Sequence, residues 1–171
     1  MNLFRLAKVL ENPYTRKIVI YGFLFLMLIS FGFFTYDSYK EAQPTYTTFD
    51  DGSEMIRARA SDFFLFTELE VPDVVPKDMI PPQIDGTKIS KYEFKLDKDK
   101  NITEASYSLK TKDAPEVAFE KYKNKLGDGF EYQSEFKHNI SGTYNANHLN
   151  IDFLRKKESG NYLILIDIDK N

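Results

Sequence analysis

The chain has 171 residues, with 23 Lys and Arg against 26 Asp and Glu, and it contains no Cys and no Trp. A net charge of −3 argues against a protein that binds nucleic acid through bulk positive charge. The absence of Cys excludes disulfides, thiol catalysis and cysteine-ligated metal sites. Hydrophobic residues make up 42% of the chain, which is enough for the core of one domain with a small appendage.

Residues 1–17 form a basic leader, in which Glu11 is the only acidic residue. Apolar residues recur in it at helical spacing, at Leu3, Leu6, Ala7 and Leu10. Two readings stay open. The leader is either a short amphipathic helix that lies on the inner leaflet and ends at Asn12-Pro13, or a flexible segment that only fixes the topology.

The uncharged run from Ile18 to Tyr36 predicts a transmembrane helix. A helix of this length spans about 28 Å, close to the roughly 30 Å hydrocarbon core of a bilayer. A buried helix of equal apolar length would need a larger core than this chain can build. The run is also longer than the apolar region of a signal peptide, and residues 33–37 offer no small-residue cleavage site. Residues 18–36 are therefore expected to lie in the lipid bilayer as an uncleaved anchor.

The charges that flank this span predict its orientation. Four basic residues precede it, and acidic residues follow it at Asp37, Glu41, Asp50, Asp51 and Glu54. Because positively charged flanks stay in the cytoplasm, the N-terminus should be cytoplasmic and the C-terminal part should lie outside the cytoplasm, at an inner or plasma membrane. Four of the 23 basic and one of the 26 acidic residues precede the span, so residues 37–171 carry a net charge of −6.

Residues 37–86 are predicted to be a stalk and a proline-rich connector. The polar stretch 37–51 is expected to lift the domain off the membrane, and a short helix is expected from Glu54 to about Ala60, capped by Ser53. The apolar cluster 63–66 is expected to pack under the domain. The alternation in residues 68–71 predicts a strand, and four prolines between 72 and 82 then favour an extended connector.

Residues 87–171 are predicted to form an antiparallel sheet with one helix packed on it, in the order β-β-α-β-β-β. Alternating apolar residues predict a hairpin over 91–110 with a turn at 97–101, and strands near 130–136, 149–153 and 162–168, the last of them central. The helix should begin near Ala114 with Asp113 as cap and end at Gly127, burying Ala118, Phe119, Tyr122 and Leu126. The fold class is therefore α+β. A fragment that begins near Val71 is expected to fold without metal or reductant.

Two patterns that resemble metal sites are both incomplete. His138 and His148 could approach each other if they flanked a hairpin, but no third ligand joins them at a suitable spacing. Asp97, Asp99 and Asn101 imitate the start of a calcium loop, yet the required Gly is Ile102 and the twelfth position is Ser108. A surface histidine near a turn and a charged hairpin turn explain these residues, so neither a metal nor a cofactor is expected.

No catalytic motif stands out in the sequence. Nucleophile elbows, Ser-x-x-Lys motifs and glycine-rich phosphate loops are all absent from it. No catalytic, metal-binding or cofactor-binding residue is therefore assigned, and the chain is not expected to be an enzyme.

The succession of Val75–Pro81, a hairpin and residues 114–122 with Leu126 resembles small envelope-anchored bacterial proteins, and the frequent Lys, Asn, Ile and Phe are typical of bacterial proteins. This resemblance implies neither a family nor site residues. The expected function is a single-pass bacterial envelope protein whose small, non-catalytic exported domain binds another protein, as an accessory subunit of a membrane assembly. The alternative is a domain that senses or binds a small molecule on the open face of its sheet.

Overall fold

A computed structural model describes residues 13–60, 68–135, 138–158 and 160–171. It divides into two compact units, residues 1–38 and 39–171, of which the second holds the sheet. The apolar cluster predicted at 63–66 and most of the basic leader lie outside the described residues.

The first unit consists of the long apolar helix α2 (Pro13–Ala42), which continues into the start of the second unit. The helix is longer at both ends than the run 18–36, and Pro13 begins it where the sequence suggested an end. By length and composition it could cross a membrane, and none of the side chains in its most apolar window is buried. The hydroxyl of Thr35 donates to the carbonyl oxygens of Phe31 and Gly32 at 3.0 and 2.9 Å, so this polar group is satisfied within the helix.

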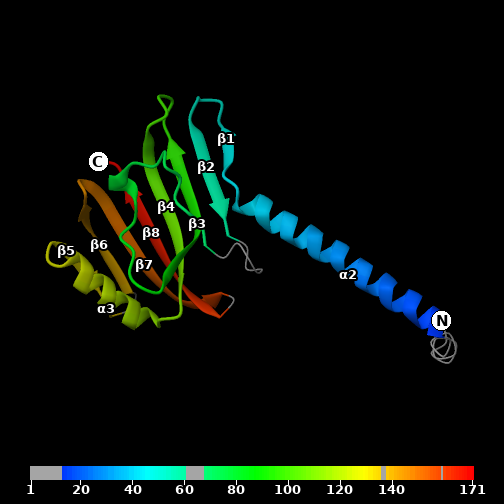
Figure 1. Ribbon diagram of the computed structural model, residues 1–171. Coiled ribbons are helices and arrows are strands. Elements are labelled where there is room, and N and C mark those ends of the chain that lie inside the picture. The colour runs from blue at the N-terminus through cyan, green and yellow to red at the C-terminus, as the bar shows by residue number, and fades with distance from the viewer. Residues whose placement is uncertain (1–12, 61–67, 136–137, 159) are drawn as a thin grey trace. The chain divides into compact units, whose positions relative to one another are not determined.

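The second unit is an eight-stranded antiparallel sheet with one helix, which confirms the α+β class (Figure 1). The spatial order is β1-β2-β3-β4-β8-β7-β6-β5, so the chain builds the sheet from its two edges toward β4 and β8. The elements in chain order are β1 (Thr45–Thr48), β2 (Glu54–Arg59), a 3-10 turn (Lys77–Met79), β3 (Thr87–Leu96), β4 (Ile102–Thr111), α3 (Pro115–Leu126), β5 (Phe130–Gln133), β6 (His138–Tyr144), β7 (Asn147–Glu158) and β8 (Asn161–Asp169).

The segment 37–86 differs most from its prediction. The helix expected at 54–60 is strand β2, which pairs with β3 so that Ile56 lies opposite Phe94 and Ala58 opposite Tyr92. The expected stalk contains β1, and Asp51-Gly52 is the turn between these two strands, with Gly52 at φ 83°. Glu, Met, Arg and Ala favour helix locally, but pairing with β3 buries Ile56 and Ala58, which a short isolated helix could not do.

The proline-rich connector is part of the domain core. Figure 1 shows it crossing the same face of the sheet as α3. Its side chains Leu69, Val75, Met79 and Ile84 are buried, and the hydroxyl of Tyr107 donates to the carbonyl oxygen of Met79 at 2.8 Å. The strand predicted at 68–71 is absent from this described segment, where the Leu69 N–H makes a single bond to the Ile89 carbonyl oxygen.

The C-terminal half agrees with the prediction, except that the structure has one more strand than was predicted. The turn at 97–101, the hairpin β3–β4 and the central position of β8 are confirmed. Strand β6 was missed, so the order after residue 87 is β-β-α-β-β-β-β. Helix α3 ends at Gly127 as predicted, at φ 70°, but its N-cap is Ala114 with no side-chain bond. Asp113 instead pairs with Lys121 at 2.5 Å.

The buried face of α3 is the predicted one. Ala118, Phe119 and Tyr122 are at most 3% exposed. The Phe119 ring meets the rings of Tyr132, His138 and Phe153 edge-on, at centroid distances of 6.2, 5.2 and 5.7 Å. The core thus lies between one face of the sheet and a cover made of α3 and the connector, and the opposite face of the sheet stays open.

Candidate functional site

The open face of the sheet carries mostly polar side chains, together with Leu163 and Leu165 of β8. In its centre the Ser106 hydroxyl donates to Asp167 Oδ1 across β4 and β8 at 2.7 Å. Toward β6 the side-chain amide of Asn139 donates to Asn150 and Asp152, at 2.8 and 2.7 Å. Asp152 and Asp167 are thus hydrogen-bonded to their neighbours, as in a solvated sheet surface.

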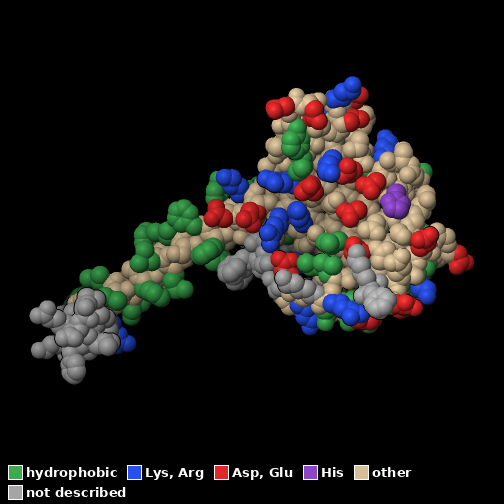
Figure 2. Space-filling model, turned by 180° about the vertical axis from the view of Figure 1, so that it is seen from behind, with side chains coloured by type: hydrophobic (Ala, Val, Ile, Leu, Met, Phe, Trp, Pro, Cys, Tyr) green, Lys and Arg blue, Asp and Glu red, His purple; other side chains and the backbone are tan. Residues whose placement is uncertain are grey.

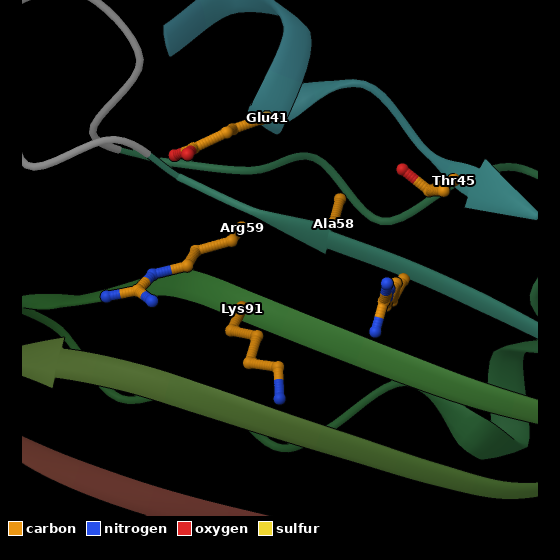
Figure 3. Close-up of a pocket in the computed structure, with 6 residues that line it drawn as sticks. Glu41, Thr45, Ala58, Arg59 and Lys91 are labelled. Carbon is orange, nitrogen blue, oxygen red and sulfur yellow. The ribbon is translucent and has the colours of Figure 1, made fainter. Parts of the chain in front are cut away.

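A groove lies on the other half of the open face, over β2, β3 and β4. It consists of two adjoining hollows of about 280 and 200 Å³, which share Arg59 and Lys91. Figure 3 shows Arg59 and Lys91 in the first hollow, below Glu41 and Thr45. The second hollow reaches Lys110 and Glu158, with the hydroxyls of Ser90 and Ser108 in its lining. We call the two hollows together the basic groove.

The strand register explains why these cations share one face. Arg57 and Arg59 alternate with the buried residues Ile56 and Ala58 along β2. Arg59 lies opposite Lys91 of β3, and Lys91 lies opposite Ser108 of β4. The ladder therefore places polar side chains of three strands side by side, within about 5 Å per strand.

Arg59 and Lys91 of the basic groove are only weakly neutralised. Arg59 lies 3.5 Å from Glu158, and Lys91 lies 3.6 Å from Glu93. The Arg59 and Glu158 side chains are 64% and 43% exposed, so solvent screens this pair. Arg57 forms no ion pair with any side chain that the structure describes. Because the lining holds four cations and two carboxylates, this groove is locally positive on a domain whose net charge is negative. Figure 2 shows Lys and Arg side chains on this face among acidic ones.

The side chains of the groove can bind an anion electrostatically, but they do not form a recognisable catalytic group. Its described lining contains neither a histidine nor an aromatic side chain, and its two carboxylates come from different hollows. An aromatic lining would favour a small apolar ligand, and this groove does not have one among its described residues. Guanidinium and ammonium groups instead suit carboxylate or phosphate groups.

The two histidines lie on opposite faces of the sheet. His138 begins β6, is 7% exposed and packs edge-on against Phe119. His148 is exposed and lies opposite Thr143 near the β6–β7 turn. His148 is the surface histidine that was predicted, whereas that prediction was wrong for His138. No group of three or more metal-ligating side chains occurs within the described ranges.

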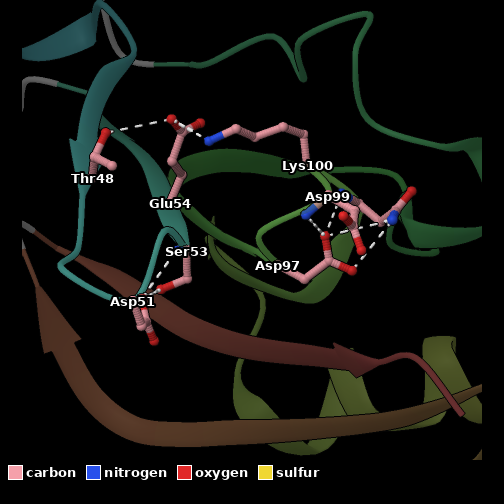
Figure 4. A network of polar contacts seen from close by, with 8 residues as sticks. Thr48, Asp51, Ser53, Glu54, Asp97, Asp99 and Lys100 are labelled. Carbon is pink, nitrogen blue, oxygen red and sulfur yellow. Dashed lines mark hydrogen bonds and ion pairs between the residues drawn. The ribbon is translucent and has the colours of Figure 1, made fainter.

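The calcium-like residues form a closed hairpin turn (Figure 4). Asp97 Oδ1 accepts hydrogen bonds from the backbone N–H groups of Asp99 and Asn101, at 2.8 and 2.9 Å. These bonds, the one from Asn101 first, hold the pKa of Asp97 below 3.8. Lys100 in the same turn pairs with Glu54 at 2.6 Å and lowers the pKa of that carboxyl group, which ties the two hairpins together. The carboxylate of Asp97 therefore serves the turn itself.

Sequence reasoning named no residue of the basic groove as functional. Lys91 and Lys110 were recognised only as the polar positions of two strands, and Arg57 and Arg59 fell within a predicted helix. The signal that could have found them is the alternation Ile56-Arg57-Ala58-Arg59 after Asp51-Gly52, which is typical of a half-buried strand that follows a hairpin turn.

Comparison of the chain with protein-family models, with curated proteins and with solved structures found no match.

Proposed function

We propose that this chain is a single-pass protein of a bacterial envelope membrane, and that its non-catalytic domain binds another protein through the open face of the sheet. Residues 18–36 within α2 would form the anchor. The domain would lie outside the cytoplasm and act as an accessory subunit of a membrane assembly.

The observation that carries the anchor is the exposure of apolar side chains along α2. Leu28 and Phe33, for example, are 69% and 66% exposed, and the most apolar window of the helix has no buried residue. Burying one such side chain away from water is worth about 1.5–3 kcal/mol, so a helix bearing them favours a bilayer strongly over water. The basic residues before this window and the acidic ones after it support a cytoplasmic N-terminus.

Binding through the open face is supported by how the second unit uses its surfaces. One face of the sheet is already covered by α3 and the connector, which bury the aromatic core. The open face is mostly polar, and it holds the basic groove, whose described lining contains no histidine. Such a surface suits recognition of a charged partner.

The test is membrane fractionation of cells that produce the full chain, followed by alkaline extraction and protease treatment of intact spheroplasts. The proposal expects the chain to stay in the membrane fraction with its N-terminus intact, and the protease to degrade residues after 38. A variant with Leu24, Leu26 and Leu28 changed to Asp should leave the membrane fraction. Recovery of the unaltered chain in the soluble fraction would contradict the anchor, and protection of the domain would contradict the orientation.

A second candidate function is the binding of a small anionic molecule, and the basic groove is the observation that favours it. Its larger hollow, of about 280 Å³, is near the lower end of the range for ligand pockets. Isothermal titration of the detergent-solubilised chain with small anions tests this candidate. Saturable binding of one such anion, lost when Lys91 is changed to Gln, would favour it.

A further inference from the structure

We propose that the basic groove binds an extended acidic segment of the protein partner, with carboxylates at every second position. The inference rests on the proposed function for the existence of a protein partner, and it adds which chemistry that partner must present.

The spacing of the cations is the first argument. Arg57 and Arg59 are two positions apart on β2, about 6.7 Å along the strand. Lys91 lies opposite Arg59, and Lys110 lies two positions beyond Ser108, the residue opposite Lys91. The cations therefore step diagonally across three strands and cover roughly 16 Å.

An extended peptide matches this path. Its side chains point to one side at every second residue, about 6.6 Å apart, so the first, third and fifth side chains cover roughly 13 Å, and the long Arg and Lys side chains can reach them along the path. A single phosphate or carboxylate would need donors that converge on one point, whereas these four cations are spread along the groove. A chain with spaced carboxylates can meet Arg57, Arg59 and Lys91 in turn.

The charge of the domain and the lining of the groove both argue against a nucleic acid as the partner. A nucleic acid carries phosphates along its whole length and would extend beyond the groove onto a domain whose net charge is −6, whereas a short acidic segment needs to contact only the groove. The described lining also lacks the aromatic side chains on which bases stack. Glu41 in one hollow and Glu158 in the other limit how far an acidic segment can extend.

The ion pairs of Arg59 and Lys91 leave these two cations able to exchange partners. The Arg59–Glu158 and Lys91–Glu93 pairs are long and at least partly exposed, so their loss on binding costs little. Arg57 has no ion pair with a described residue to give up. An incoming carboxylate can therefore form bidentate contacts with Arg57 and Arg59 without breaking a buried network.

The experiment measures fluorescence anisotropy of a labelled peptide, Asp-Ser-Asp-Ser-Asp, with the full chain in nonionic detergent. The control peptide has Asn in place of each Asp. The test variant is Arg57→Gln with Arg59→Gln, and the matched control is Lys77→Gln with Lys98→Gln. Both pairs are exposed and lose two positive charges, but Lys77 and Lys98 do not line the groove. Thermal unfolding of each variant establishes that it is folded.

The expected result is binding of the acidic peptide at about 10 mM salt, where surface charges are least screened. Binding should be weaker by about tenfold or more in the arginine variant and unchanged in the lysine control. Equal affinity in the two variants, or equal binding of the Asn peptide, would overturn the inference. Inorganic triphosphate that binds more tightly than the peptide, through the same arginines, would also overturn it in favour of a small anion.

Co-purification of partners with the same variants separates the two proposals. A partner that is lost with the arginine variant and kept by the lysine control supports both. A partner that co-purifies equally with both variants supports the proposed function and overturns the groove inference. If no partner co-purifies with any form while the peptide binds through the arginines, the proposed function fails and the peptide site stands.

Discussion

Truncation of Phe119 to Ala should strongly destabilise the domain. The Phe119 ring is 3% exposed and meets three other rings edge-on. Loss of the buried ring removes about 1.5–3 kcal/mol of transfer free energy, and the cavity left among the three neighbouring rings adds to this loss. The expected loss in the free energy of unfolding is about 3–5 kcal/mol, as for other buried aromatic residues.

The assay is urea denaturation of residues 39–171, the unit that contains all eight strands, α3 and their core. Tyrosine fluorescence and far-ultraviolet circular dichroism report unfolding, since the chain has no Trp. With a slope near 2 kcal/mol per M, the Phe119→Ala midpoint should fall by about 1.5–2.5 M.

Lys121→Ala is the control on the outer side of α3. Lys121 pairs with Asp113, but the two side chains are 44% and 28% exposed, so the loss should stay below about 1 kcal/mol. Equal midpoints for Phe119→Ala and Lys121→Ala would refute the packing of α3 on the sheet.

Three further predictions concern the same domain. Tyr122→Phe should leave the free energy of unfolding unchanged or raise it, because the buried Tyr122 hydroxyl has no hydrogen-bond partner among the described residues. Tyr107→Phe should lower it by about 0.5–1.5 kcal/mol, because it removes the hydrogen bond to the Met79 carbonyl oxygen. Equal urea midpoints for the two variants would contradict this prediction. Gly142→Ala should cost about 1–3 kcal/mol, because its Cβ would lie 2.7 Å from Phe130 Cδ1 and 3.2 Å from Phe130 Cα, while Ser141→Ala should have little effect on the melting temperature. The folded-state pKa of Asp97 is lowered, so its contribution to stability is present above pH 3.8 and is lost as pH falls through the folded pKa. The Asp97→Asn variant should therefore lose less stability between pH 5 and pH 2 than the unaltered domain does. Parallel profiles of stability against pH for the two proteins would contradict this prediction.

The sequence predicted the elements in which pattern and local chemistry agree. The alternation Tyr92, Phe94 and Leu96 is that of β3, and the apolar face of α3 with its stop at Gly127 was also correct. Asp113 did not cap α3, because its carboxylate pairs with Lys121 while Ala114 takes the cap position.

The errors arose where long-range pairing decides the structure. Residues 54–59 favour helix by composition, yet they form β2 because β3 offers a partner more than thirty positions away. β6 contains Asn139, Ser141 and Gly142, so it lacks a strong apolar alternation, and it is held between β5 and β7. A fragment that starts at Val71 would lose β1 and β2 and uncover the edge of β3. Residues 39–171 form the compact unit that keeps both strands.

The basic groove could not be predicted because it depends on register. Arg57, Arg59, Lys91 and Lys110 come from three strands, and only the pairing of β2 with β3 and β4 places them on one surface. Once residues 54–60 are read as a helix, the two arginines fall on no shared face with Lys91. The error in one element therefore concealed the site.

Site-specific photo-crosslinking in intact cells tests the central claim, that the open face of an anchored domain binds a protein. A photoreactive amino acid replaces Lys95 or Asn150 on the open face, or Val117 on α3, where the native side chain is 48% exposed. The account predicts one membrane-associated protein crosslinked from positions 95 and 150 and none from position 117. Crosslinks from position 117 alone, or from no position in cells where the chain is folded and membrane-bound, would contradict it.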